Sequence, residues 1–134
     1  MKKVSELLET EHEDPSLPGD WTLVHPVGQR IRIGSRAELL VVGRRDRQNK
    51  WEPDIDLGPF DTLRTVSRRH AVVVGDARSC LLREESPSAN GTYINGKRIK
   101  PFSDNFPQIG DSIRFGVVEF MLQRMQWSSP ERDD

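Results

Sequence analysis

The chain has 134 residues, of which 34% are apolar and 31% charged, and its formal net charge is −1. This length fits one domain with tails, and the near-neutral charge argues against a general nucleic-acid binder. Cys80 is the only cysteine, which excludes an internal disulfide and a cysteine-based zinc cage.

The lone cysteine favours a reducing compartment, and no apolar signal core or membrane-length apolar segment occurs in the sequence. We therefore expect a cytoplasmic protein without a membrane partner.

Residues 1–20 differ from the rest of the chain. Val4, Leu7 and Leu8 lie at helical spacing over about two turns. Pro15 and Pro18 end this pattern, and an isolated helix of that length is marginal in water. We expect an acidic N-terminal arm that is either disordered or docked as a short helix.

From residue 21 the pattern is that of β-strands separated by turns. Asn95-Gly96 lies between two short β runs and predicts a two-residue hairpin of type I′. Short turns with almost no helix favour an all-β fold, an antiparallel β-sandwich over residues 21–126 followed by a polar tail at 127–134. The predicted strands cover residues 21–25, 30–33, 39–42, 54–57, 71–74, 80–84, 92–94, 97–99, 112–115 and 118–125.

Three polar segments lie at the ends of predicted strands. They are Gly43-Arg44, Ser67-Arg68-Arg69-His70 and Asn90-Gly91-Thr92. A guanidinium offers a planar fork of donors, a serine hydroxyl with nearby N–H groups can share an anion, and a carboxamide can both donate and accept. If these segments meet at one end of the sandwich, they form a site for a doubly charged oxyanion on a peptide.

Two roles are conceivable for His70. It could act as a general base for Ser67, but no nucleophile elbow, oxyanion-hole motif or orienting carboxylate accompanies the pair. A histidine at the start of a buried strand more often hydrogen-bonds the backbone of a loop, because buried polar groups must be paired. We therefore expect a structural histidine and a protein that is not an enzyme, with no metal and no cofactor.

The ordered combination of these segments with Asn95-Gly96 resembles the forkhead-associated (FHA) domain family, over about Trp21 to Met125. The resemblance implies a sandwich of about eleven strands in two sheets, whose loops at one end bind phosphothreonine peptides. It also implies a role for each matching residue.

By that resemblance, Arg44 and Ser67 would contact the phosphate, and Arg68 would add its backbone N–H. Asn90 would hydrogen-bond the peptide backbone, and Thr65 lies where the family tunes its preference for the residue three after the phosphothreonine. The positions that shape the loops are Gly43, His70, Gly91, Asn95 and Gly96. Ala89 stands where many members have a serine or threonine, so one hydroxyl contact is missing.

The function implied is a signalling module that recruits or senses partners phosphorylated by Ser/Thr protein kinases. Some small bacterial members carry a phosphorylatable threonine in an N-terminal arm that folds back on the domain. Thr10, between Glu9 and Glu11, is a hypothetical site of this kind and would give an intramolecular contact.

Two alternatives remain open at this point. One is a scaffold domain for protein interaction with weak or no phosphate dependence. The other is a nucleic-acid surface, which would need interleaved aromatic residues and a steep salt dependence. Acidic residues are interspersed along the candidate surface, which consists of Arg44, Arg45, Arg47, Lys50, Arg68 and Arg69.

Overall fold

The computed structural model describes residues 19–85, 87 and 89–127. These residues form ten strands in two sheets, with one short 3₁₀ helix, η1 (Gly58–Phe60). The prediction of an all-β sandwich is confirmed. The predicted arm with Thr10, and the tail beyond residue 127, lie outside the described residues.

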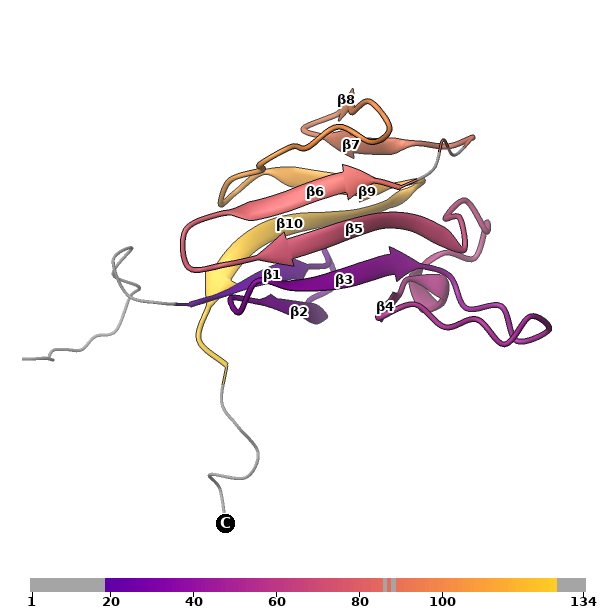
Figure 1. Cartoon of the computed structure of the whole chain (residues 1–134), viewed down its shortest axis with the longest axis horizontal. Helices are drawn as coiled ribbons and strands as arrows, with labels where there is room; N and C mark the ends of the chain where they lie inside the picture. Colours follow the sequence, from indigo (N-terminus) through magenta and orange to yellow (C-terminus); the bar gives the residue numbers. More distant parts are fainter. Residues whose placement is uncertain (1–18, 86, 88, 128–134) are drawn as a thin grey trace, which may run out of the picture.

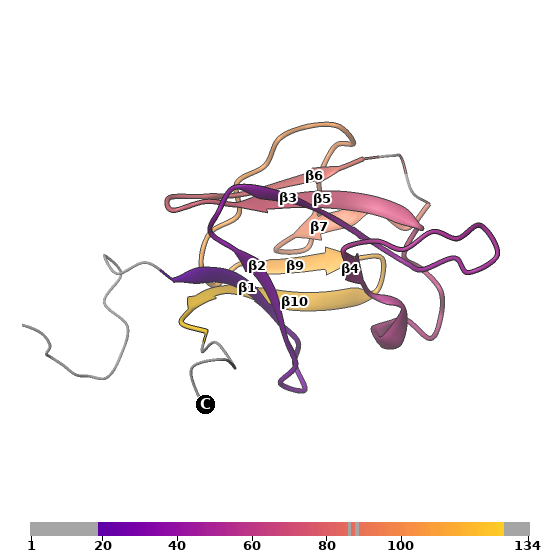
Figure 2. The same ribbon diagram turned by 60° about the horizontal axis from the view of Figure 1, so that its bottom comes forward.

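The two sheets face each other (Figures 1 and 2). The larger sheet has the strand order β2-β1-β10-β9-β7-β8, and the smaller has the order β4-β3-β5-β6. The strands are β1 (Asp20–Val24), β2 (Arg30–Gly34), β3 (Glu38–Gly43), β4 (Ile55–Asp56), β5 (Arg69–Gly75), β6 (Cys80–Glu84), β7 (Thr92–Ile94), β8 (Lys97–Arg98), β9 (Ser112–Phe115) and β10 (Val118–Met125).

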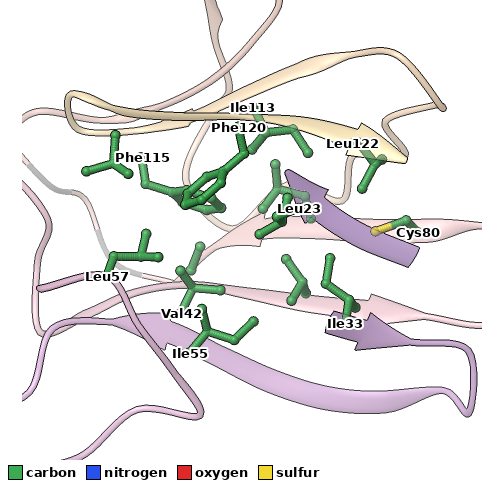
Figure 3. Close-up of a cluster of buried hydrophobic side chains, with 14 of the residues drawn as sticks. Leu23, Ile33, Val42, Ile55, Leu57, Cys80, Ile113, Phe115, Phe120 and Leu122 are labelled. Carbon is green, nitrogen blue, oxygen red and sulfur yellow. The ribbon is translucent and has the colours of Figure 1, made fainter. Parts of the chain in front are cut away.

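Alternation of side chains along the strands builds the core. In β10, Val118, Phe120 and Leu122 are buried, whereas Glu119 and Met121 between them are exposed. Successive side chains of a strand point to opposite faces, so this pattern places one face of the larger sheet against the smaller sheet. Figure 3 shows the interlayer cluster, which includes Leu23, Val42, Ile55, Ile113, Phe115 and the buried thiol of Cys80.

The pairing of β3, β5 and β6 brings the polar segments to one end of the sandwich. Gly43, the last residue of β3, pairs with Arg69, the first residue of β5. Ala71 of β5 pairs with Glu84, the last residue of β6. The loops that follow β3, precede β5 and follow β6 therefore share one end, at the right of Figure 1.

The predicted Asn95-Gly96 turn is confirmed. Asn95 and Gly96 both have positive φ, 51° and 81°, as a type I′ hairpin requires. The β5–β6 turn closes through a 2.9 Å hydrogen bond from the Asp76 N–H to the Ser79 carbonyl.

One strand pair departs from the antiparallel pattern. β4 is only two residues long and runs parallel to the end of β3, with Val42 opposite Ile55. Period-two alternation shows which residues are buried but not the direction of the neighbouring strand. The connection from β3 to β4 is long enough to reverse twice, and it includes the projecting loop at the right of Figures 1 and 2.

Candidate functional site

Arg44 and Asn90 meet on one short piece of backbone. The Arg44 Nε donates to the Val66 carbonyl at 3.1 Å, and the Asn90 Nδ2 donates to the Thr65 carbonyl at 3.1 Å. Because Thr65 and Val66 are neighbours in the chain, these two bonds place the side chains of two remote segments side by side. The convergence predicted for the three polar segments is therefore present.

Gly43 allows the 67–68 backbone to lie against the end of β3. A Cβ added at Gly43 would lie 1.9 Å from the Arg68 carbonyl oxygen, so no larger residue fits without movement. The same carbonyl accepts the Arg44 N–H at 3.2 Å. The close approach fixes the Ser67-Arg68 segment beside Arg44.

This arrangement leaves hydrogen-bond donors for a ligand. Within the described part of the chain, the two terminal nitrogens of the Arg44 guanidinium form no hydrogen bond or ion pair. The same holds for the Ser67 hydroxyl and the Arg68 N–H. Arg44 and Ser67 are half-buried and Arg68 is exposed, so an anion can reach them. Together they can bind a tetrahedral oxyanion.

His70 is fully buried beneath this group and links two of the loops. Its Nδ1 accepts the Ser67 N–H at 3.0 Å, and its Nε2 lies 3.0 Å from the Gly91 carbonyl. Since Nδ1 accepts a hydrogen bond, Nε2 carries the proton and donates it. Burial lowers the pKa of His70 below its ordinary value, so the ring is neutral at pH 7.

Position 91 requires a glycine for its backbone conformation and for lack of space. Its φ is +75°, and an added Cβ would lie 2.6 Å from the Arg98 Nε. The Gly91 carbonyl accepts from the His70 ring and from the Gly116 N–H, the latter at 2.9 Å. These two bonds hold the Asn90-Gly91 turn against the Ser67 loop and the β9–β10 turn.

Thr65 uses its hydroxyl inside the protein. The hydroxyl donates to Asp61 at 2.9 Å and accepts the Val117 N–H at 2.9 Å. Thr65 therefore lies at the rim of the site, but its hydroxyl is already engaged. A preference for the third residue after a phosphothreonine stays a prediction for this position.

Asp61 is a site residue that sequence reasoning missed. Burial alone would raise the pKa of this carboxyl, but hydrogen bonds from the Val66 and Thr65 N–H groups and the Thr65 hydroxyl bring the pKa below its ordinary value. The carboxylate thereby fixes the backbone whose carbonyls Arg44 and Asn90 bind. An aspartate four or five residues before a loop segment is a cap-like signal that could have identified it.

Trp51 and Asp46 were also missed. The Trp51 Nε1 donates to the Arg68 carbonyl at 2.9 Å, and the Arg68 Nη1 pairs with the Asp46 carboxylate at 2.7 Å. Hydrogen bonds from Asn49 and then from Arg68 lower the pKa of Asp46 to about 2. The long loop after β3 is thus attached to the loop that carries Ser67.

Glu84 lies behind the site as a buried carboxylate. It accepts the Thr92 hydroxyl at 2.7 Å, and both side chains are fully buried. This bond joins the end of β6 to the start of β7, which fixes both ends of the loop that carries Asn90. A sequence signal was present, because alternation along β6 puts Glu84 on the same face as Cys80 and Leu82, both of which are buried.

Asn95 and Gly96 lie at the other end of β7, away from the three loops. The Asn95 side chain accepts the Ser112 N–H at 2.9 Å and donates to Asp111 at 3.0 Å. Their contribution is to the β7–β8 hairpin and the start of β9.

The described residues contain no group of three or more His, Cys, Asp and Glu side chains that could hold a metal ion. Across residues 19–85, 87 and 89–127, no helix is long and apolar enough to pass through a membrane.

Solved structures of similar fold include proteins from distant organisms. EmbR of Mycobacterium tuberculosis, in complex with a low-affinity phosphopeptide, has 24% identity and a TM-score of 0.63, with 83% of this chain and 26% of EmbR covered. The N-terminal FHA domain of S. cerevisiae Rad53p, in complex with a phosphothreonine peptide, has 20% identity and a TM-score of 0.60, with coverage of 78% and 93%. An FHA domain of Arabidopsis thaliana has 17% identity and a TM-score of 0.64, with coverage of 90% and 98%.

These three likenesses are likenesses of fold. The chain spans about a quarter of the length of EmbR but nearly all of the other two domains. A family model described as the FHA domain matches residues 40–116, which is more than half of the chain and includes all three polar segments. The chain therefore belongs to the FHA domain family.

Proposed function

We propose that this protein binds phosphothreonine peptides and thereby recruits or senses partners phosphorylated by Ser/Thr protein kinases. The observation that carries the proposal is the convergence of Arg44 and Asn90 on the neighbouring carbonyls of Val66 and Thr65. This convergence leaves the Arg44 guanidinium beside donors of the Ser67 loop.

Each donor has a role that follows from its chemistry. The guanidinium of Arg44, the Ser67 hydroxyl and the Arg68 N–H hold the phosphate, which carries about −1.5 to −2 charges and three acceptor oxygens. Asn90 donates its Nδ2 to the protein, which leaves its Oδ1 to accept an N–H of the peptide backbone. The site therefore reads both the phosphate and an extended main chain.

Two of the structural relatives support this assignment. EmbR was solved with a phosphopeptide and the Rad53p domain with a phosphothreonine peptide. Hydrogen bonds to charged groups typically contribute about 1.5–3 kcal/mol each, which is enough for specific recognition through a few contacts.

The arrangement of His70 argues against a hydrolytic Ser67–His70 pair. Both ring nitrogens are already bonded to backbone groups, and the ring is fully buried. No ring nitrogen is left to take a proton from the Ser67 hydroxyl. We infer a binding module without catalytic activity, acting in the cytoplasm, where its single buried thiol would stay reduced.

Substitution of Arg44 by alanine tests the proposal. A phosphothreonine peptide should bind the wild-type protein, and its non-phosphorylated form should not. Arg44→Ala should weaken phosphopeptide affinity by at least about 100-fold, because two or more charge-assisted hydrogen bonds are lost. Isothermal titration calorimetry measures both values.

Arg78→Ala is the matched control, since Arg78 is an exposed arginine in the β5–β6 turn at the other end of the sandwich. Its affinity should equal that of the wild type. Equal affinities for the phosphorylated and non-phosphorylated peptides would overturn the assignment, and an unchanged affinity in Arg44→Ala would remove Arg44 from the site.

A further inference from the structure

The loop between β3 and β4 carries a concentration of positive charge next to the proposed site. We call residues 45–52 the basic loop; it projects beyond the ends of the sheets at the right of Figures 1 and 2. Together with the adjacent Ser67 loop it has five basic side chains and two carboxylates, in a chain whose net charge is −1. The basic side chains are Arg45, Arg47, Lys50, Arg68 and Arg69, and the carboxylates are Asp46 and Glu52.

The basic loop is held in a defined position. Asp46 and Trp51 exchange two backbone hydrogen bonds of 2.9 Å, which close the loop at its base. The Trp51 ring then binds the Arg68 carbonyl through Nε1 and lies 5.3 Å from the Arg69 guanidinium carbon. A loop fixed in this way presents its charges without a large ordering cost.

Two of its cations have no partner in the part of the chain that the structure describes. Arg45 pairs with Glu52 at 2.8 Å, and Arg68 pairs with Asp46. The exposed side chains of Arg47 and Lys50 make no hydrogen bond or ion pair with described residues. Their charge is therefore available to a ligand.

Trp51 connects this charge to the proposed phosphate site. It lines an open hollow of about 360 Å³ together with Ser67, Arg68 and Arg69. It also lines a second hollow of about 380 Å³, with Arg45, Arg47 and Lys50 among the other lining residues. A peptide held by Ser67 and Arg44 that continues past Trp51 would reach the second hollow.

We propose that the basic loop forms a second anion subsite, in which Arg47 and Lys50 bind a negatively charged group that flanks the phosphothreonine on the same peptide. The group is a carboxylate or a second phosphate, and this inference rests on the function proposed above. The subsite selects phosphothreonine segments with acidic or doubly phosphorylated flanks.

The expected gain is moderate, because exposed ion pairs contribute little and are screened by salt. Two such pairs should raise the affinity for an acidic-flanked peptide about threefold to tenfold over a neutral-flanked peptide. The gain should shrink when the ionic strength rises from about 0.05 M to 0.5 M, where charges are screened over a few ångströms.

The test titrates four phosphothreonine peptides into the protein by calorimetry. One peptide has neutral flanks, one has glutamates on the N-terminal side of the phosphothreonine, and one has glutamates on the C-terminal side. The fourth peptide has a phosphoserine on the flank where glutamates give the higher affinity. The wild type is compared with Arg47→Ala/Lys50→Ala and with a charge-matched control, Arg36→Ala/Arg78→Ala. Arg36 and Arg78 are exposed and lie at the other end of the β3–β5 pair.

The proposal expects one flank to raise affinity in the wild type and in the control, and the gain to disappear in Arg47→Ala/Lys50→Ala while binding of the neutral-flanked peptide is unchanged. A larger gain with phosphoserine than with glutamate would identify phosphate as the preferred group, and equal gains would identify any carboxylate. Equal affinity for all four peptides, or a gain that the double variant retains, would overturn the subsite but leave the proposed function intact. Absence of binding by the neutral-flanked peptide would instead overturn the proposed function.

Discussion

At both ends of the β3–β5 strand pair a glycine lies in close contact with a backbone carbonyl, but the two ends differ in function. At one end Gly43 lies against the Arg68 carbonyl, where an added Cβ would be 1.9 Å from the oxygen. At the other end Gly75 lies against the Gly34 carbonyl, where an added Cβ would be 2.5 Å from the oxygen. In both places a glycine lets a second segment of backbone approach a strand closely.

The ends differ in what happens to their polar groups. Around Gly75 they satisfy one another, since the Asp76 carboxylate accepts the Arg78 and Ser79 N–H groups at 2.8 Å and the Asp76 carbonyl accepts the Trp21 Nε1 at 2.9 Å. Around Gly43, the two terminal nitrogens of the Arg44 guanidinium and the Ser67 hydroxyl form no hydrogen bond within the described residues. The Gly75 end is a closed end that contributes stability, and the Gly43 end is an open end that keeps hydrogen-bond donors for a ligand.

Replacing each glycine by alanine tests this contrast most strongly. Both Gly43→Ala and Gly75→Ala should destabilise the fold by about 1–3 kcal/mol, because backbone must move to make room. Only Gly43→Ala should also abolish phosphopeptide binding, since it displaces the Ser67-Arg68 segment. Urea unfolding measures stability and calorimetry measures binding. Loss of binding in Gly75→Ala at a protein concentration where it is folded would contradict the division.

His70→Ala should show how far the open end depends on its buried support. The change leaves the Ser67 N–H without its acceptor and removes one of the two donors to the Gly91 carbonyl, which costs about 2 kcal/mol of unfolding free energy. Affinity for a phosphothreonine peptide should fall about tenfold, because two loops lose their common anchor. A variant with wild-type stability and affinity would show that the loops are fixed by other contacts.

Ser67 and Ser79 lie at opposite ends of the β3–β5 pair, so the same substitution can be compared at both ends. Ser67→Ala should leave stability unchanged and reduce phosphopeptide affinity about tenfold, the value of one charge-assisted hydrogen bond. Ser79→Ala should leave affinity unchanged and change stability by less than about 0.5 kcal/mol, because the hydrogen bonds between residue 79 and Asp76 use the N–H and carbonyl of residue 79, which alanine keeps. Parallel calorimetry and urea unfolding on both variants give the four numbers. Any reversal of this pattern would sink the distinction between the ends.

Mild acid should lower the free energy of unfolding through the open end and not through the closed end, and this effect should be the smallest of those predicted. The pKa of His70 is lowered in the native state, so the unfolded chain binds more protons below about pH 6.5 and stability falls as pH decreases through that value. The slope is at most about 1.4 kcal/mol per pH unit. Asp76 has its pKa lowered by the Ser79 and Arg78 N–H groups, so its contribution is lost only below about pH 4. Urea unfolding between pH 7.5 and 5.5 should show a steeper slope for the wild type than for His70→Gln, and equal slopes would exclude His70 as the source.

Much of the fold was accessible from the sequence because its signals are local. The alternation in 118–125, the apolar run at 71–74 and the Asn95-Gly96 turn each determine structure within a few residues, and all three are confirmed. The parallel pairing of β4 with β3 depends on the path of a long connection instead. No local pattern reports such a path.

The site was accessible in part for the same reason. Arg44, Ser67, His70 and Asn90 were predicted from strand-end positions, and the structure brings them together. Trp51 was missed because its indole binds the Arg68 carbonyl, which is remote in sequence. Asp61 and Glu84 bind residues that are nearer in the chain, and their local signals were overlooked.

The burial of Cys80 makes the protein convenient for fluorescence work. Burial raises the pKa of its thiol to about 12, and its side chain lies in the interlayer cluster, so a maleimide dye would not react with it at neutral pH. A cysteine introduced by Gln48→Cys, at an exposed position of the basic loop, would then be the single labelling position, without prior removal of the native one. A reporter on the projecting loop could follow peptide association and release in real time.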